Sequence, residues 1–152
     1  MGKWTDRLAE IGVRLPHVVP PVAAYVPAVR SGSHVYVSGQ VPVVDGKLPA
    51  TGKVGAEVSA EDAKQYVRTC VLNALAAVDA LVRLDSMVRV VKVVGFVASA
   101  EGFNGQPAVI NGASELLGEI FGEAGQHARS AVGVAELPIG APVEVEMIVE
   151  VA

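Results

Sequence analysis

Two runs near the carboxyl end of the chain, ARSAVGV at residues 128–134 and PVEVEMIVEV at residues 142–151, decide the fold. In the second run, apolar and charged residues alternate, which is typical of a strand with one buried face. The connection between the runs is short and contains Pro and Gly. We therefore expect an antiparallel pair of strands that brings Glu144 near the level of Arg129.

Arg129 is the residue of this pair that points most directly to a ligand. A guanidinium group stays charged at any working pH, and its fork of N–H donors matches a carboxylate bidentately. We therefore expect a small anionic ligand in a cleft shared with Glu144, whose pKa a neighbouring cation would lower. The residues alone leave open the alternative of an ordinary Arg–Glu cross-strand pair on a solvated face.

Upstream of these runs the sequence predicts a regular succession of strands and helices. Ser59 followed by Glu61 and Asp62 is typical of a helix N-terminus, and Pro107 suits the first turn of a second helix. The expected elements are strands at 23–29 and 34–43, a long loop at 45–58, a helix from 59 to about 83, a strand at 88–98, a helix from 107 to about 121, and strands at 130–135 and 143–151. This β-β-α-β-α-β-β order predicts an α+β fold, with a single mixed sheet and two helices on one face.

The first residues look like an addition to that unit. Trp4, Leu8 and Ile11 follow Thr5, a candidate N-cap, at helical spacing, which predicts a short helix at 4–13 before a proline-rich connector at 16–21. We expect an N-terminal extension at 1–19 and one domain at 20–152, a division that suits a chain of 152 residues. The high apolar fraction of 51% favours an oligomer interface.

Composition also excludes several classes of function. The net charge of −4 and the scattered Lys and Arg residues argue against nucleic acid as a partner. No apolar run reaches the ~18 residues of a membrane span, and the charged start is unlike a secretory signal, so we expect no membrane contact and a cytoplasmic location. Cys70 stands alone on an apolar helical stripe, as a core thiol would, and the three histidines show no ligand spacing. We expect neither a metal nor another cofactor.

Several stretches taken together resemble the RidA/YjgF family, also labelled L-PSP endoribonuclease-like. The resemblance covers about residues 20–152 and rests on five motifs: Tyr25-Val26, YVSGQVP at 36–42, Phe96-Val97, Val109-Ile110-Asn111, and RSAV at 129–132 followed by Leu137-Pro138 and VEVE at 143–146. It implies a chorismate-mutase-like arrangement that associates as a homotrimer, with clefts between the subunits.

The same resemblance implies roles for individual residues. Arg129 would hold the carboxylate of an imine or enamine derived from an amino acid, and Glu144 would orient the water or mediate proton transfer. Asn111 would lie near the ligand, as would four further residues: Tyr25, Ser38, Gly39 and Ala131. At Ala131 the deaminase members have Cys, and this position acts mainly through its backbone carbonyl. In isolation, Tyr25 could equally be a half-buried strand residue, and Ser38-Gly39 a β-bulge.

The leading hypothesis is therefore a hydrolase of the 2-iminobutanoate/2-iminopropanoate deaminase kind, which converts reactive enamines or imines to 2-oxo acids and ammonia. A second hypothesis is a binding or regulatory protein that takes a small carboxylate without turnover. A third, the endoribonuclease of the older family label, conflicts with the charge balance. A chorismate mutase would fit the architecture, but only Arg129 is available at the site for a dicarboxylate.

Overall fold

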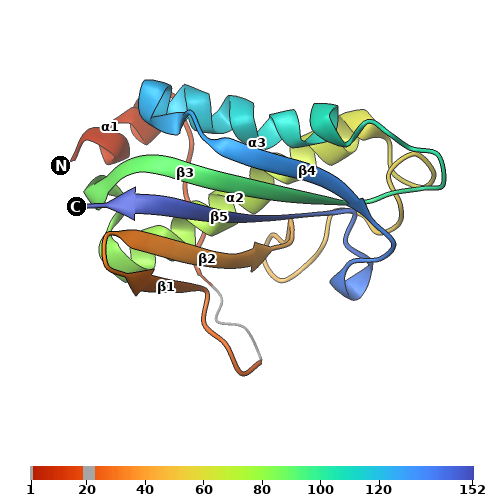
Figure 1. Cartoon of the computed structure of the whole chain (residues 1–152), viewed down its shortest axis with the longest axis horizontal. Helices are drawn as coiled ribbons and strands as arrows, with labels where there is room; N and C mark the ends of the chain where they lie inside the picture. Colours follow the sequence, from red (N-terminus) through yellow and green to blue (C-terminus); the bar gives the residue numbers. More distant parts are fainter. Residues whose placement is uncertain (1, 19–22) are drawn as a thin grey trace.

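The alternating run at the carboxyl end forms the central strand of a five-stranded sheet. In the computed structural model, which describes residues 2–18 and 23–152, the strands lie side by side in the order β1-β2-β5-β3-β4 (Figure 1). Their bounds are β1 Ala28–Ser31, β2 His34–Gln40, β3 Met87–Ala98, β4 Ala128–Val134 and β5 Val143–Val151. Only β3 and β4 run parallel, so the sheet is mixed and the predicted α+β class is confirmed.

The expected antiparallel pairing of β4 with β5 is wrong. β3 lies between them, parallel to β4 and antiparallel to β5. The segment from β3 to β4 contains a helix, and a strand–helix–strand unit places its second strand parallel to the first. β5 instead enters antiparallel between β2 and β3, where it is paired on both sides.

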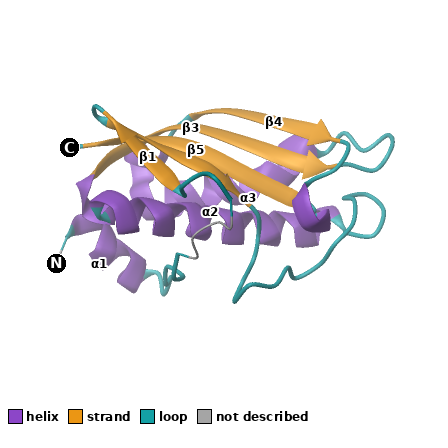
Figure 2. Cartoon of the chain, turned by 90° about the horizontal axis from the view of Figure 1, so that it is seen from below, coloured by secondary structure: helices purple, strands orange, loops and turns teal. Residues whose placement is uncertain are grey.

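Three helices accompany the sheet: α1 Lys3–Glu10, α2 Ala60–Val82 and α3 Gln106–Phe121. α2 and α3 cover one face, as predicted, and Figure 2 shows them together below the strands. The hydroxyl of Ser59 accepts a hydrogen bond from the backbone N–H of Asp62, which confirms the expected N-cap. The core lies between the helices and the sheet, where β5 buries its alternate side chains: Val143, Val145, Met147, Val149 and Val151. Cys70 is fully buried in this core, as expected.

The amino-terminal helix packs on the same core through Trp4 and Leu8, which are both buried. It ends three residues earlier than predicted, and Gly12 behind it has a φ of 71°. Thr5 is not its N-cap: Gly2 has that position, and the carboxylate of Asp85 accepts from the backbone N–H groups of Trp4 and Thr5. The hydrogen bond from the Thr5 hydroxyl lowers the pKa of Asp85. The expected domain boundary at 19/20 lies outside the described residues.

Further strand boundaries differ from the prediction, and β4 begins at Ala128 rather than residue 130. β1 begins at Ala28 rather than residue 23, and β2 ends at Gln40 rather than residue 43. Within β2, the register with β5 shifts between Val37 and Gln40. The shift is a bulge that contains Ser38 and Gly39. None of the helices in the described part of the chain combines the length and apolar character that crossing a membrane requires.

Candidate functional site

Arg129 lies on β4, on the face of the sheet that carries the helices. It pairs with Val93 of β3, which is fully buried against the core. Its guanidinium reaches α3, where Nη1 donates to Asn111 Oδ1 at 2.9 Å and to Ser114 Oγ at 3.1 Å. Nη2 donates to the backbone carbonyl of Pro107 at 3.1 Å. Arg129 is thus held by three acceptors on one helix, and Asn111 is one of them.

A histidine continues this arrangement. His127 Nε2 lies 2.9 Å from Ser114 Oγ, and its Nδ1 lies 2.5 Å from the carbonyl oxygen of Gly125. The sequence shows neither metal-ligand spacing among its histidines nor an acid–base histidine pair, and it does not single out His127 or Ser114. The sequence does contain a signal for His127. It lies two positions before Arg129, and alternate residues of an extended strand share one face of the sheet. We call Arg129, Asn111, Ser114 and His127 the arginine half.

The guanidinium keeps donors for a ligand. Nη1 gives both of its N–H groups to α3, whereas Nη2 gives one. Within residues 2–18 and 23–152, the Nε–H and the second Nη2 N–H find no protein acceptor. These two groups are available to a bidentate carboxylate. Ala131 lies two residues further along the same face of β4, partly buried against the core.

Glu144 lies in different surroundings. It stands on β5, where its carboxyl group approaches Gly39: a Cβ built on Gly39 would lie 2.9 Å from Glu144 Oε1. The neighbouring Ser38 donates through its hydroxyl to the carbonyl of Val26 at 2.7 Å, which holds the segment next to Tyr25 against β2. The Tyr25 side chain is 55% exposed. We call Glu144, Gly39, Ser38 and Tyr25 the glutamate half.

The electrostatics of Glu144 differ from the expectation. Burial raises the pKa of its carboxyl group, and the charge of nearby Glu146 raises it further. No described residue forms a hydrogen bond or an ion pair with Glu144, so a lowered pKa caused by Arg129 is not found within the single chain. Its negative charge is also felt by the Cys70 thiol, whose pKa is raised by burial first and by Glu144 second.

The two halves lie on opposite faces of the sheet. Arg129 aligns through Val93 with Met147 on the helix face, whereas Glu144 pairs with Phe96 on the face that has no helix. The offset is three residues along β5 and two strand spacings across, roughly 10 Å in each direction. The cleft that we expected Arg129 and Glu144 to share is therefore absent from the single chain.

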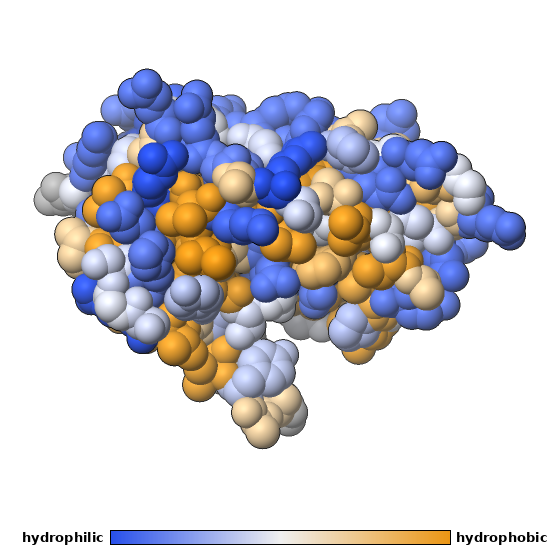
Figure 3. Space-filling view, viewed as in Figure 1, coloured by the Kyte–Doolittle hydropathy of each residue, from blue (hydrophilic) through white to orange (hydrophobic). Residues whose placement is uncertain are grey.

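The helix-free face, here called the open face, is unusually apolar. It carries Val29, Tyr36 and Val132, which are 52%, 49% and 43% exposed, together with the partly exposed Phe96 and Ile148. Figure 3 shows hydrophobic patches over the strands on this side, with charged groups between them. Exposed apolar patches of this kind, rimmed by polar groups, are typical of a protein–protein interface.

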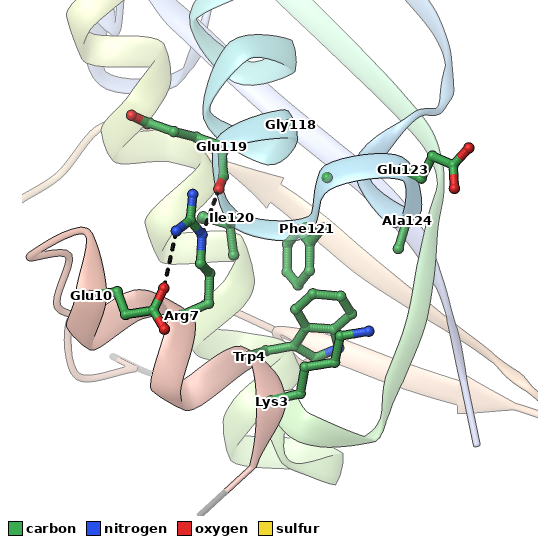
Figure 4. A pocket seen from close by; sticks show the side chains of 11 residues that line it. Lys3, Trp4, Arg7, Glu10, Gly118, Glu119, Ile120, Phe121, Glu123 and Ala124 are labelled. Atoms are coloured by element: carbon green, nitrogen blue, oxygen red, sulfur yellow. Dashed lines mark hydrogen bonds and ion pairs between the residues drawn. The ribbon is translucent and has the colours of Figure 1, made fainter.

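A separate groove lies between α1 and the end of α3. It encloses about 630 Å³ and is lined by Lys3, Trp4 and Arg7 on one side and by Glu119 and Phe121 on the other (Figure 4). Arg7 crosses it, bonded to Glu10 and to the carbonyl of Glu119. None of the predicted site residues lines this groove. Among the described residues no group of three or more His, Cys, Asp or Glu could hold a metal ion.

Comparison with curated proteins finds relatives along nearly the whole chain. Protein TCP17 of Trypanosoma cruzi is 42% identical over 151 residues, which cover 98% of this chain and 94% of that protein. The 2-iminobutanoate/2-iminopropanoate deaminase of Dermatophagoides farinae is 34% identical over 138 residues, 90% of this chain and 93% of the deaminase.

Solved structures agree with this relationship. Atu1372 of Agrobacterium tumefaciens is 45% identical, with a TM-score of 0.90 over 98% of this chain and 92% of that one. Escherichia coli TdcF, solved with bound serine, is 28% identical, with a TM-score of 0.63 over 91% of this chain and 94% of that one. The family model Endoribonuclease L-PSP matches residues 16–151, and the chain therefore belongs to this family, the RidA/YjgF family that its motifs resemble.

Proposed function

We propose that this protein hydrolyses small imines or enamines derived from amino acids to 2-oxo acids and ammonia. The observation that carries the proposal is the state of Arg129: three acceptors fix the guanidinium, while Nε–H and one Nη2 N–H stay available for a carboxylate. The kinship with a 2-iminobutanoate/2-iminopropanoate deaminase supports this substrate class. The serine bound to TdcF supports a ligand that carries an amino-acid carboxylate.

The chemistry needs few groups. A water oxygen attacks the imine carbon and gives up a proton, while the C=N electrons move to nitrogen, which takes a proton. The hydroxyl proton of the resulting amino alcohol then passes to nitrogen, and ammonia leaves as the C=O bond forms. Glu144 is suited to carry these protons, because a carboxylate can accept a proton from the attacking water and then donate it to nitrogen. Neither a metal nor an organic cofactor is required by this scheme.

The site is completed between copies of the chain. Arg129 and Glu144 lie on opposite faces of one sheet, so one substrate can touch both only if they come from different subunits. The apolar open face around Glu144 favours such packing, with an incoming Arg129 as the cation that Glu144 lacks. We propose the homotrimer that the sequence resemblance implies, with Tyr25, Ser38 and Gly39 beside the ligand on the glutamate side, and Asn111 and Ala131 on the arginine side.

The direct test is ammonia release from 2-aminoacrylate, generated by a second enzyme, with the native protein and Arg129→Ala. We expect kcat/KM to fall about 100-fold or more, because an unanchored imine loses its alignment with the water. Arg14→Ala removes the same charge from an exposed position that has no side-chain partner among the described residues. Equal rates for Arg129→Ala and the Arg14→Ala control would refute the carboxylate clamp.

A complementation experiment tests the intersubunit site. Co-expression of Arg129→Ala with Glu144→Gln gives mixed assemblies in which about one quarter of the interfaces pair an intact Arg129 with an intact Glu144. We therefore expect activity to recover toward that fraction, although each variant alone is inactive. A site within one chain would give no recovery, because every chain carries one of the two defects.

A specific observation also supports a second function, the binding of small carboxylates without turnover. The arginine half is complete in one chain, whereas Glu144 contacts no ionic partner among the described residues, and Ala131 stands where deaminase members carry Cys. Retained binding of pyruvate, lost in Arg129→Ala, together with no acceleration of imine hydrolysis, would favour this function over the deaminase.

A further inference from the structure

Arg129, Ser114 and His127 form a chain of hydrogen bonds in which Arg129 donates to Ser114 and Ser114 can donate to His127. Because Nη1 of Arg129 donates to Ser114 Oγ, that hydroxyl keeps its own proton to donate onward to His127 Nε2. Nδ1 of His127 faces the carbonyl oxygen of Gly125, which can only accept, so Nδ1 carries the imidazole proton. The arrangement with Nδ1–H toward Gly125 and Nε2 accepting from Ser114 uses a donor and an acceptor at each of these contacts.

We propose that Ser114 and His127 are positioning residues for carboxylate recognition: they hold the Arg129 guanidinium in the orientation that keeps Nε–H and one Nη2 N–H free for the ligand. The inference rests on the proposed function of Arg129 and extends it to two residues that the sequence did not single out. His127 does not touch the ligand; it acts through Ser114.

The physical argument is one of pre-organisation. A free arginine side chain samples many rotamers, and binding must otherwise remove this conformational entropy. Asn111 and Pro107 accept single N–H groups and are themselves fixed by α3. Ser114 differs, because its hydroxyl can rotate, and only an acceptor on its far side fixes its lone pair toward Arg129. His127 supplies that acceptor and is itself anchored to the backbone at Gly125.

The geometry also indicates what the ligand requires. A guanidinium held through Nη1 presents its remaining donors to a planar, two-oxygen anion, so the recognised group is a carboxylate rather than a neutral carbonyl or hydroxyl. Loss of the hydrogen bonds from Arg129 through Ser114 to His127 leaves the charge of Arg129 in place, but the guanidinium is no longer held in one orientation. Binding should therefore weaken without disappearing, and the effect should be in KM more than in kcat.

The experiment measures pyruvate binding by calorimetry and imine hydrolysis in five proteins. These are the native chain, Ser114→Ala, His127→Leu, His127→Gln and the control Ser130→Ala, which removes a hydroxyl from an exposed position of β4. We expect Kd and KM to rise about tenfold in Ser114→Ala and His127→Leu, with kcat within about twofold. Gln keeps an amide oxygen that can accept from Ser114, so His127→Gln should recover most of the affinity.

Nitrogen-15 NMR can follow the Ser114–His127 hydrogen bond in the native protein. The ¹⁵N signals of His127 should report the neutral Nδ1–H form, and Nε2 should shift when pyruvate occupies Arg129. In Ser114→Ala the shift should vanish, because the connection to Arg129 is cut. This measurement remains informative even if His127→Leu fails to fold.

The outcomes separate this inference from the function on which it rests. Unchanged pyruvate binding in Arg129→Ala would remove the carboxylate clamp itself. Abolished binding in Arg129→Ala, combined with native Kd values in Ser114→Ala and His127→Leu, would overturn only the positioning role. An Nε2–H form of His127 in the native protein would also overturn it, because Ser114 would then have no acceptor there.

Discussion

The arginine half and the glutamate half of this sheet are built in opposite ways. Arg129 lies among three neutral acceptors of α3 that take three of its five N–H donors, and these acceptors are anchored in turn by His127 and by the helix backbone. Glu144 is placed against the glycine backbone of β2, with a second carboxylate nearby and no cation among the described residues. One chain thus holds the proposed carboxylate-binding group in place but leaves the proposed proton-transfer group without a cation among the described residues.

The two residues differ because a helix covers Arg129, whereas Glu144 lies on the open face. A helix packed over an edge strand offers side chains at successive turns, and Pro107, Asn111 and Ser114 are spaced to reach one guanidinium. No helix of the described part of the chain covers the open face, so among these residues Glu144 has no charged partner. Partial burial without such a partner is unfavourable for a carboxylate, which is why its pKa rises.

The largest effect on stability and pyruvate binding should come from disturbing α3, which carries the acceptors of Arg129. Gly112 lies between Asn111 and Ala113 on α3, and a Cβ there would approach the backbone oxygen of Lys64 on α2 to 2.3 Å. Gly112→Ala should therefore push α3 away from α2 and lower stability by about 2 kcal/mol, or roughly 6 °C in Tm. Pyruvate binding should weaken as well, because α3 carries the acceptors of Arg129. Thermal melts and calorimetry check both effects.

The matched control lies on the same helix. Gly118→Ala introduces the same methyl group where nothing lies within 4 Å, so it should stabilise the helix by about 0.5 kcal/mol. If both variants melted at the same temperature, close packing between α2 and α3 would not be what holds the arginine half.

A smaller effect should follow from the equivalent change in the glutamate half. A methyl group at Gly39 would meet the end of the Glu144 side chain, which can swing away, rather than backbone. Gly39→Ala should thus leave Tm almost unchanged but displace the carboxylate, and kcat for imine hydrolysis should fall about tenfold while KM stays near native. Rate measurements over a range of imine concentrations separate the two constants. A rise in KM with native kcat would instead make Glu144 part of substrate binding.

The sequence predicts those features of the fold that depend on local patterns. Ser59 marks the start of α2, and alternation in residues 143–151 identifies the core side of β5. The pairing of β4 with β5 failed because a short Pro- and Gly-rich connection predicts a hairpin locally. The position of β3 between those strands depends on a crossover through α3, which no local pattern encodes.

The site residues divide along the same line. The family motifs predict Arg129, Glu144 and Asn111 as site residues, but a motif does not say which face of the sheet each residue occupies. Ser114 and His127 lie 13 residues apart, on a helix and just before a strand, so their contact exists only once α3 packs beside β4. The partners of His127 are a hydroxyl and a carbonyl oxygen, and the spacing of histidines along the sequence does not reveal such contacts.

The smallest predicted effect tests whether Glu144 truly lacks a partner in the single chain. In an Arg129→Ala background, Glu144→Gln should raise the free energy of unfolding by roughly 0.5 kcal/mol at pH 8, a value that allows for solvent screening of a half-exposed group. The folded-state pKa of Glu144 is raised, so the wild-type carboxyl group loses stability as pH rises from its ordinary value, about 4.3, through the folded value. The advantage of Gln should therefore vanish near pH 4. Urea denaturation across this range measures it, with the exposed Glu101→Gln as a flat control.

The native background supplies the decisive contrast. If Arg129 of another copy reaches Glu144 in the assembly, its charge lowers the pKa of that carboxyl group, and Glu144→Gln should then destabilise the protein at pH 8 rather than stabilise it. The two residues lie on opposite faces of one sheet, so a coupling between them in a double-mutant cycle cannot arise within one chain. The same stabilisation in both backgrounds would show that Glu144 remains uncompensated in the assembled protein, and that the two halves do not form one site.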